Sequence, residues 1–128
     1  NYLEKFIMSI RAEKVASIVK RALSQPISDF AREQNAGIAT VTTVRFSPDL
    51  TLAKVYISIY GGKISPARFL QMLEEEKYEL RGIVARSVRL KTIPDLKFFL
   101  DDTIDQMEHI QQLLNKAKEE DAKLKENQ

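Results

Sequence analysis

RGIVARSVRLKTIPDLKFFLDD, residues 81–102, predicts a helix followed by a strand. At about 100° per residue, one half of a helical wheel collects apolar positions and the other half collects arginines and small residues. The apolar half holds Leu80, Ile83, Val84, Ser87, Val88 and Leu90, and the opposite half holds Arg81, Gly82, Ala85, Arg86 and Arg89. After Pro94, apolar residues at 96, 98 and 100 alternate with residues 97, 99 and 101, which predicts a strand.

The arginine half of this helix is suited to a polyanion. The small residues let a polyanion approach the backbone while guanidinium groups bind its phosphates. For an isolated basic helix, a solvated surface is the more common explanation. The rest of the chain therefore has to decide between a binding surface and an ordinary exposed face.

Two stretches upstream predict an antiparallel hairpin. Residues 38–47 are rich in Val and Thr, Pro48-Asp49 predicts a turn, and residues 51–60 alternate in polarity. One face of the second strand carries Ala53, Val55, Ile57 and Ile59, and the other carries Lys54, Tyr56, Ser58 and Tyr60. Such tyrosines can stack on RNA bases, although packing against a neighbouring strand or helix is their more common role.

Helices are predicted on both sides of the hairpin and at the C-terminal end. Residues 9–34 show helical periodicity, and Pro26 should kink this helix or divide it after Ser24. Gly37 is placed to adopt positive φ after it. Ser65-Pro66 predicts the start of another helix, and Asp102-Thr103 predicts the start of the last one. The order α-β-β-α-α-β with a trailing helix indicates a single two-layer α+β domain with a three-stranded sheet.

The charge distribution and the composition narrow the class of protein. Residues 1–100 carry a net charge of +6 and residues 101–128 carry −4, which together give the +2 of the chain. A basic body with an acidic tail suggests a polyanionic partner for the body. The chain contains no cysteine, which fits a reducing compartment, and no apolar run long enough to span a membrane.

Three segments are expected from the composition. Met8 begins the run MSIRAEK, so we expect residues 1–8 to be an extension or a cloning remnant. The domain itself should span residues 9–117. Residues 118–128 are almost entirely charged or polar and should form a flexible tail.

The residue types give no support for catalysis. The only histidine, His109, lies off the apolar stripe of the last helix, and no nucleophile elbow or phosphate-binding glycine loop is present. Asp101-Asp102 could in principle hold Mg²⁺, but a strand end and a helix cap explain them better. Glu74, Glu75 and Glu76 point about 100° apart on a helix and do not converge. We therefore expect no enzyme activity, no metal and no cofactor.

Several segments, taken in this order, carry a family resemblance. They are residues 11–16 (RAEKVA), 40–44 (TVTTV), 47–50 (SPDL), 53–58 (AKVYIS), Leu80-Arg81, Arg89-Leu90, 93–96 (IPDL) with Phe98, 101–103 (DDT), and Ile110, Leu113 and Leu114. Together they resemble the ribosome-binding factor A family, whose members assist small-subunit assembly in bacteria and organelles. The resemblance covers about residues 11–114.

The resemblance implies a fold and a role. It implies a KH-like fold of the type II order, binding to small-subunit (16S-type) rRNA and to the immature 30S subunit, and help with late maturation and rRNA processing, notably in the cold. It also implies a non-catalytic, monomeric protein of the bacterial cytoplasm, or of an organelle. The family usually has Ala-x-Gly at its helix junction, where this chain has Glu76-Lys77-Tyr78.

Seven basic residues are the candidates for rRNA contact. Arg81, Arg86 and Arg89 should bind phosphates, and Lys91, Arg45, Lys54 and Lys97 should extend the patch. Two other functions stay open: a protein-interaction module that does not bind RNA directly, using the hairpin edge or the acidic tail, and a small metal-dependent enzyme using Asp101 and Asp102.

Overall fold

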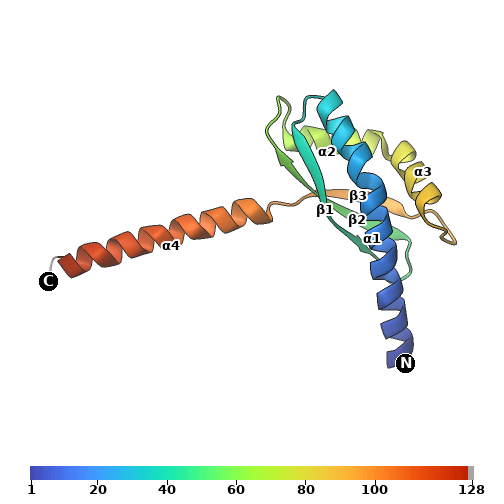
Figure 1. Ribbon diagram of the computed structural model, residues 1–128, viewed down its shortest axis with the longest axis horizontal. Helices are drawn as coiled ribbons and strands as arrows, with labels where there is room; N and C mark the ends of the chain where they lie inside the picture. Colours follow the sequence, from blue (N-terminus) through green and yellow to red (C-terminus); the bar gives the residue numbers. More distant parts are fainter. Residues whose placement is uncertain (127–128) are drawn as a thin grey trace.

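The computed structural model describes residues 1–126 and, within them, all side chains except those of Ile104, Asp105 and Glu126. The elements follow the predicted α-β-β-α-α-β order with a trailing helix (Figure 1). They are α1 (Tyr2–Glu33), β1 (Ile38–Phe46), β2 (Leu52–Tyr60), α2 (Pro66–Glu75), α3 (Lys77–Ser87), β3 (Asp95–Leu100) and α4 (Thr103–Glu126).

The three strands form one mixed sheet in the order β1-β2-β3. β1 and β2 are antiparallel, as the hairpin pattern predicts, and β3 is parallel to β2 because α2 and α3 carry the chain back between them. The pairing of β1 with β2 shifts between Val41 and Thr43, so Thr42 lies in a bulge. This register decides which side chains from different strands share a row.

One face of the sheet is covered by helices, which makes the α+β domain two-layered. The inner residues of the sheet are Ala39, Val41, Val44, Ala53, Val55, Ile57, Leu96 and Phe98, all buried. They form a single core with buried residues of α1, α2 and α3. Phe30 of α1 meets Phe69 of α2 with ring centroids 5.8 Å apart, so α1 and α2 touch at this pair of rings. Among the described residues, no helix covers the outer face of the sheet, where Arg45, Lys54 and Lys97 are exposed.

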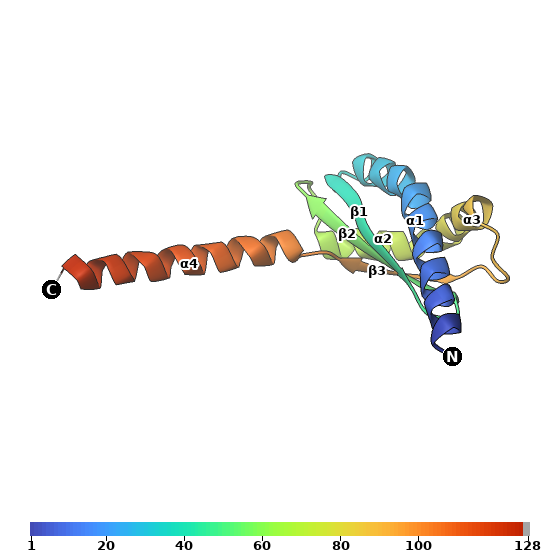
Figure 2. The same cartoon turned by 60° about the horizontal axis from the view of Figure 1, so that its bottom comes forward.

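α1 is longer than predicted and is not divided. It begins at Tyr2 rather than Ser9, because Asn1 caps it by accepting a hydrogen bond from the amide of Leu3 at 3.0 Å. The helix continues through Pro26, so a division after Ser24 is wrong. It bends near its C-terminal end (Figure 2), as expected for a helix that contains a proline. Gly37 follows with φ 97°, which confirms the predicted positive φ.

α3 is shorter than the wheel predicts. It ends at Ser87, whose hydroxyl donates to the carbonyl of Val84 at 2.8 Å. Val88 is extended (φ −150°, ψ 143°), so Val88, Arg89 and Leu90 lie in the connection to β3 and not on the helix. Their placement on the helical wheel is therefore wrong. The strand after Pro94 is confirmed as β3.

α4 leaves the body at the end of β3 and projects away from it (Figures 1 and 2). All of its described side chains are exposed. It remains helical past Ala117 as far as Glu126. Flexibility of residues 118–128 and the limits of the domain stay predictions. Within the described residues, no helix is both long and apolar enough to cross a membrane.

Candidate nucleic-acid interface

The seven candidate basic residues divide into two groups. Arg45, Lys54 and Lys97 come from the three strands, and we call them the sheet row. Arg81, Arg86, Arg89 and Lys91 come from α3 and the connection after it, and we call them the α3 group. The distribution along the sequence did not reveal this division.

The sheet row is a direct consequence of strand register. Arg45 pairs with Lys54 on one side of β2, and Lys54 pairs with Lys97 on the other. All three side chains are exposed on the outer face. Neighbouring strands lie about 4.8 Å apart, so three positive charges stand in a line. In the part of the chain that the structure describes, none of the three forms an ion pair. This line is therefore available to a polyanion.

The next outer row places two aromatic rings beside the cations. Thr43 pairs with Tyr56, and Tyr56 pairs with Phe99. The rings of Tyr56 and Phe99 stack with centroids 5.3 Å apart and an interplanar angle of 24°. Packing against the neighbouring strand, the more common role for Tyr56, is thus present. Phe99 nevertheless remains 37% exposed.

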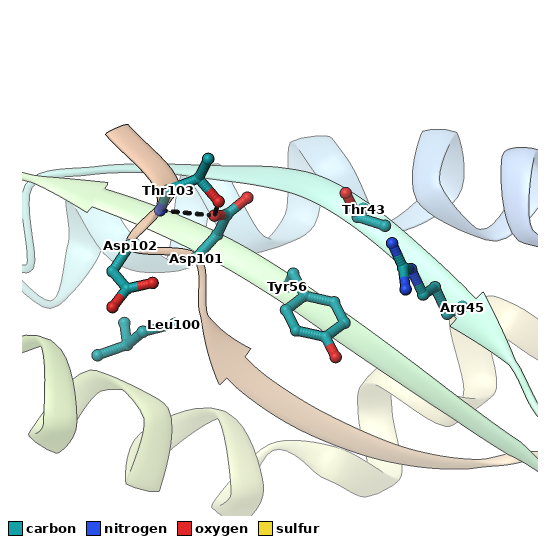
Figure 3. Close-up of a pocket in the computed structure, with 7 residues that line it drawn as sticks. All are labelled: Thr43, Arg45, Tyr56, Leu100, Asp101, Asp102 and Thr103. Atoms are coloured by element: carbon teal, nitrogen blue, oxygen red, sulfur yellow. Dashed lines mark hydrogen bonds between the residues drawn. The ribbon is translucent and has the colours of Figure 1, made fainter. Parts of the chain in front are cut away.

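A hollow of about 240 Å³ lies at the β1 side of these two rows, where Arg45, Thr43 and Tyr56 line it. Its lining residues are Thr43, Arg45, Tyr56, Leu100, Asp101, Asp102 and Thr103. Figure 3 shows Tyr56 in the middle, Arg45 toward one end and the two aspartates toward the other. The hollow therefore has a cationic end, an aromatic floor and an acidic end.

Asp101 fixes the acidic end by hydrogen bonds. Its carboxylate accepts from the hydroxyl of Thr42 at 2.6 Å and from the amide and hydroxyl of Thr103 at 3.0 and 2.5 Å. Hydrogen bonds from Thr103 and Thr42 lower the pKa of Asp101 below its usual value. Both carboxylate oxygens are thus engaged in joining β1 to the start of α4.

Arg81 is held by the protein itself. Its Nε and Nη2 groups donate to the carbonyls of Pro94 and Ile93, each at 3.1 Å. These bonds tie α3 to the connection before β3. Arg81 is half-buried, and a role in phosphate binding stays a prediction for its remaining N–H groups.

The other members of the α3 group are exposed. Arg86 lies on α3, while Arg89 and Lys91 lie in the connection. A Cβ added to Gly82 would stand 3.3 Å from Nη1 of Arg86, so the Arg86 side chain extends over the glycine. The small residue next to the arginine thus accommodates its guanidinium.

The junction of α2 and α3 is made without the family's usual residues. Glu76 alone separates the helices, with φ −90° and ψ 7°. Lys77 begins α3 and bridges Glu74 at 2.7 Å and Asp95 at 3.5 Å. Partial burial of Lys77 favours its uncharged form and acts to lower its pKa. The hydrogen bond to Glu74 and the charge of Asp95 outweigh this effect, so the pKa of Lys77 is raised. A positive-φ residue is not needed here.

Sequence reasoning missed the importance of Phe99 and Thr42. The alternation of residues 96–101 puts Phe99 on the outer face of the third strand, but its pairing with Tyr56 follows only from the parallel register of β2 and β3. Thr42 reaches Asp101, a residue 59 positions away, because the bulge in β1 displaces it. The alternation of polarity around residue 42 gives no signal of a bulge.

Comparisons with known proteins agree with this fold. The ribosome-binding factor A family model matches residues 11–114. A relative from Chloroherpeton thalassium, ribosome-binding factor A, is 36% identical over 114 residues, covering 88% of this chain and 90% of the relative.

Two solved structures are also similar. The crystal structure of ribosome-binding factor A from Thermus thermophilus is 26% identical with a TM-score of 0.61, and the match covers 70% of this chain and 94% of that chain. A homology model of the Thermus thermophilus factor, fitted into a cryo-EM map of a 30S complex, is 23% identical with a TM-score of 0.50, covering 66% and 93%. These structures share the KH-like fold.

The resemblance noted from scattered segments is thus confirmed over the same range of residues. The chain belongs to the ribosome-binding factor A family.

Proposed function

We propose that this chain is a non-catalytic assembly factor that binds small-subunit rRNA and the immature 30S subunit and assists late maturation and rRNA processing. Membership in a family of ribosome-binding factors supports the ribosomal partner. The sheet row is the observation that supports RNA as the molecule contacted. It consists of three cations from three strands, in register and without ion pairs among the described residues. Each subunit would be bound by one copy of the chain.

The mode of binding is electrostatic docking. Exposed Lys and Arg side chains neutralise phosphates and release counterions, so affinity falls as salt rises. Phosphate contacts fix position and orientation without reading the sequence. Selectivity would then come from the shape of the rRNA and from its unpaired nucleotides.

A salt titration of binding to small-subunit rRNA tests the proposal. Two triple variants are compared, Arg45→Ala/Lys54→Ala/Lys97→Ala for the sheet row and Arg86→Ala/Arg89→Ala/Lys91→Ala for the α3 group. Each lost phosphate contact should reduce the slope of log affinity against log salt by about 0.7–0.9. The sheet-row variant should show the larger reduction.

A control variant with the same change in charge is available on α4. Lys116→Ala/Lys118→Ala/Lys123→Ala removes three exposed lysines that lie away from the sheet. It should leave the slope close to that of the unchanged chain. An equal reduction in all three variants, or none in any, would contradict docking through the candidate residues.

The protein-interaction alternative is favoured by one feature. Apolar side chains of α4 are more than half exposed, namely Met107, Ile110, Leu113, Leu114 and Leu124. If α4 alone carried the interaction, binding to 30S subunits would be insensitive to both basic triple variants and would be lost on removal of residues 103–128. Retained binding of the truncated chain, together with salt-sensitive loss in the sheet-row variant, supports direct RNA binding.

A further inference from the structure

We propose that the outer face of the sheet holds an unpaired RNA nucleotide, with its base stacked on the Tyr56–Phe99 pair and its phosphates on the sheet row. The inference rests on the proposed RNA-binding function and adds the form of RNA that this face accepts.

The aromatic pair provides a stacking surface rather than part of the core. Tyr56 and Phe99 lie on the face opposite the helices, and their rings pack on each other at 5.3 Å. Phe99 keeps 37% of its surface exposed. An aromatic ring on a solvated sheet face gains stabilisation when another flat ring covers it. A nucleobase supplies such a ring whatever its identity.

The neighbouring cations are placed to bind the phosphates of the same strand of RNA. Along each strand, Arg45, Lys54 and Lys97 lie two residues from Thr43, Tyr56 and Phe99. Two strand residues correspond to about 6.6 Å, which is within reach of the phosphates flanking a stacked base. The sheet thus presents a charged row and an aromatic row side by side, the combination that binds single strands.

The hollow over Tyr56 limits the size of the group that enters it. Its volume of about 240 Å³ lies below the ~300–1,000 Å³ of sites that enclose a drug-sized ligand. It therefore suits one base rather than a separate small molecule.

The acidic end of the hollow sets the direction of the nucleotide. Asp101 and Asp102 repel phosphate, so the backbone of the RNA should lie toward Arg45 and the base toward the aspartates (Figure 3). Both carboxylate oxygens of Asp101 are engaged within the protein, whereas the carboxylate of Asp102 accepts, among the described residues, from the side-chain amide of Gln106 at 3.0 Å through one oxygen. Asp102 can therefore accept a hydrogen bond from an amino group on the base edge.

An unpaired nucleotide is required because a duplex hides the faces of its bases. In a double helix each base is already stacked on its neighbours, and only its edges and backbone are accessible. A duplex could contact the sheet row through phosphates but could not cover Tyr56 and Phe99. The inference therefore separates single-stranded from double-stranded RNA.

A tryptophan reporter tests this directly in the full chain. The sequence contains no tryptophan, so Tyr56→Trp places the one tryptophan of the variant at the proposed stacking position, where it can be excited selectively over the tyrosines. A short oligoadenylate should quench its fluorescence strongly, and the same strand paired with oligouridylate should quench it far less. Tyr60→Trp is the matched control, since Tyr60 lies on the same strand but is 81% exposed at its end. It should respond weakly to both forms.

Affinity measurements complete the test. Phe99→Ala should weaken binding of oligoadenylate roughly tenfold, within the range for loss of one stacked base, and should leave duplex binding nearly unchanged. Tyr60→Ala should change neither, and denaturant unfolding of each variant checks that the fold is intact.

The outcomes distinguish this inference from the proposed function. Equal quenching by single-stranded and duplex RNA, or an unchanged affinity of Phe99→Ala for oligoadenylate, would overturn base stacking. The proposed function would still stand if the sheet-row variant lowered the salt slope for rRNA. If the sheet-row variant left the salt slope for rRNA unchanged, the proposed function itself would be contradicted.

Discussion

α1 and α4 are both long helices with an apolar stripe, yet the stripe of α1 is packed whereas the described side chains of α4 are exposed. α1 has 32 residues and α4 has 24. Five residues of α1 are buried in the core: Val15, Val19, Leu23, Ile27 and Ala31. The corresponding stripe of α4 is solvent-exposed wherever its side chains are described, with Leu114 52% exposed.

The difference lies in what faces each helix. α1 precedes β1 directly and lies across the inner face of the sheet, where Ala39, Val41 and Val44 meet its stripe. α4 starts beyond the end of β3 and points away from that face (Figure 1). The first turns of α1 behave like α4, since Leu3 and Phe6 are 62% and 63% exposed. The periodicity of apolar residues thus specifies a helix, but an apolar surface opposite the helix decides whether those residues become buried.

The largest effect should come from removing a buried residue of the α1 stripe. Leu23 is fully buried, so Leu23→Ala should lower the free energy of unfolding by about 2–5 kcal/mol, from lost apolar burial and the cavity left behind. Leu114→Ala is the matched change on α4 and should alter the free energy of unfolding by less than about 0.5 kcal/mol. Urea unfolding followed by circular dichroism measures both.

Destabilisation of the chain by more than about 1 kcal/mol in Leu114→Ala would contradict an exposed α4 stripe. That outcome would show the α4 stripe packed in solution, either on the body or on a second copy. Repeating the measurement at several protein concentrations separates these two cases, because only association makes the unfolding midpoint depend on concentration.

Two arginines of α3 should also differ in their effect on stability, because one is bonded to the protein and the other is exposed. Arg81 donates to the carbonyls of Pro94 and Ile93, whereas Arg86 is exposed and lies over Gly82. Arg81→Ala should lower the free energy of unfolding by about 1–2 kcal/mol, since two carbonyls lose a charged donor. Arg86→Ala should change it by less than about 0.5 kcal/mol and should affect RNA binding instead.

Equal stability losses in the two variants would contradict this assignment. Arg81→Lys refines the measurement, because lysine keeps the charge but cannot provide the two N–H groups of the guanidinium fork. It should recover less than half of the lost stability.

Most of the fold could be predicted from local patterns. The strands have period-2 alternation, the helices have apolar stripes, and Ser65-Pro66 caps α2 as its residue types predict, with Ser65 accepting from the amide of Arg68 at 3.1 Å. One error lies within a helix, since α1 continues through Pro26, and two lie at helix ends, where local backbone geometry decides the outcome. The Asn1 cap extends α1 to Tyr2, and the extended conformation of Val88 ends α3 before Arg89.

The candidate site was less predictable because it depends on register. Arg45 and Lys54 lie on the two strands of the predicted hairpin, but no local pattern shows that Lys97, on the third strand, joins their row. The charge of Arg81 suggests binding, but its contacts with two carbonyls depend on how the connection before β3 folds back on α3. Charge patterns indicate the type of partner, whereas the arrangement of the site requires tertiary structure.

The smallest effect concerns Asp101, which joins the packed body to α4. The pKa of Asp101 is lowered by hydrogen bonds from Thr103 and Thr42. A carboxyl group with a lowered folded-state pKa stabilises the fold above its unfolded pKa of about 3.9, and this contribution is lost as the pH falls through the folded value. Stability from Asp101 should therefore be complete at neutral pH and disappear only below about pH 4.

Thr42→Val removes the bond from β1 and leaves the bonds from Thr103 in place. The pKa of Asp101 should rise toward its usual value, so the stability that this group loses in acid should become smaller, and the loss should be complete at a higher pH. A carboxyl-carbon NMR titration measures the change, with Asp49 as the internal reference, because the bonds from Thr51 and Ser47 that lower the pKa of Asp49 are untouched. Amide exchange at Thr103 should speed up in parallel, since the first turn of α4 would lose one of its attachments to the sheet. If the pKa of Asp101 were the same in the Thr42→Val variant and the unchanged protein, the bond from Thr42 would not anchor α4 to β1. The lack of packing that distinguishes α4 from α1 would then begin at the first residue of α4.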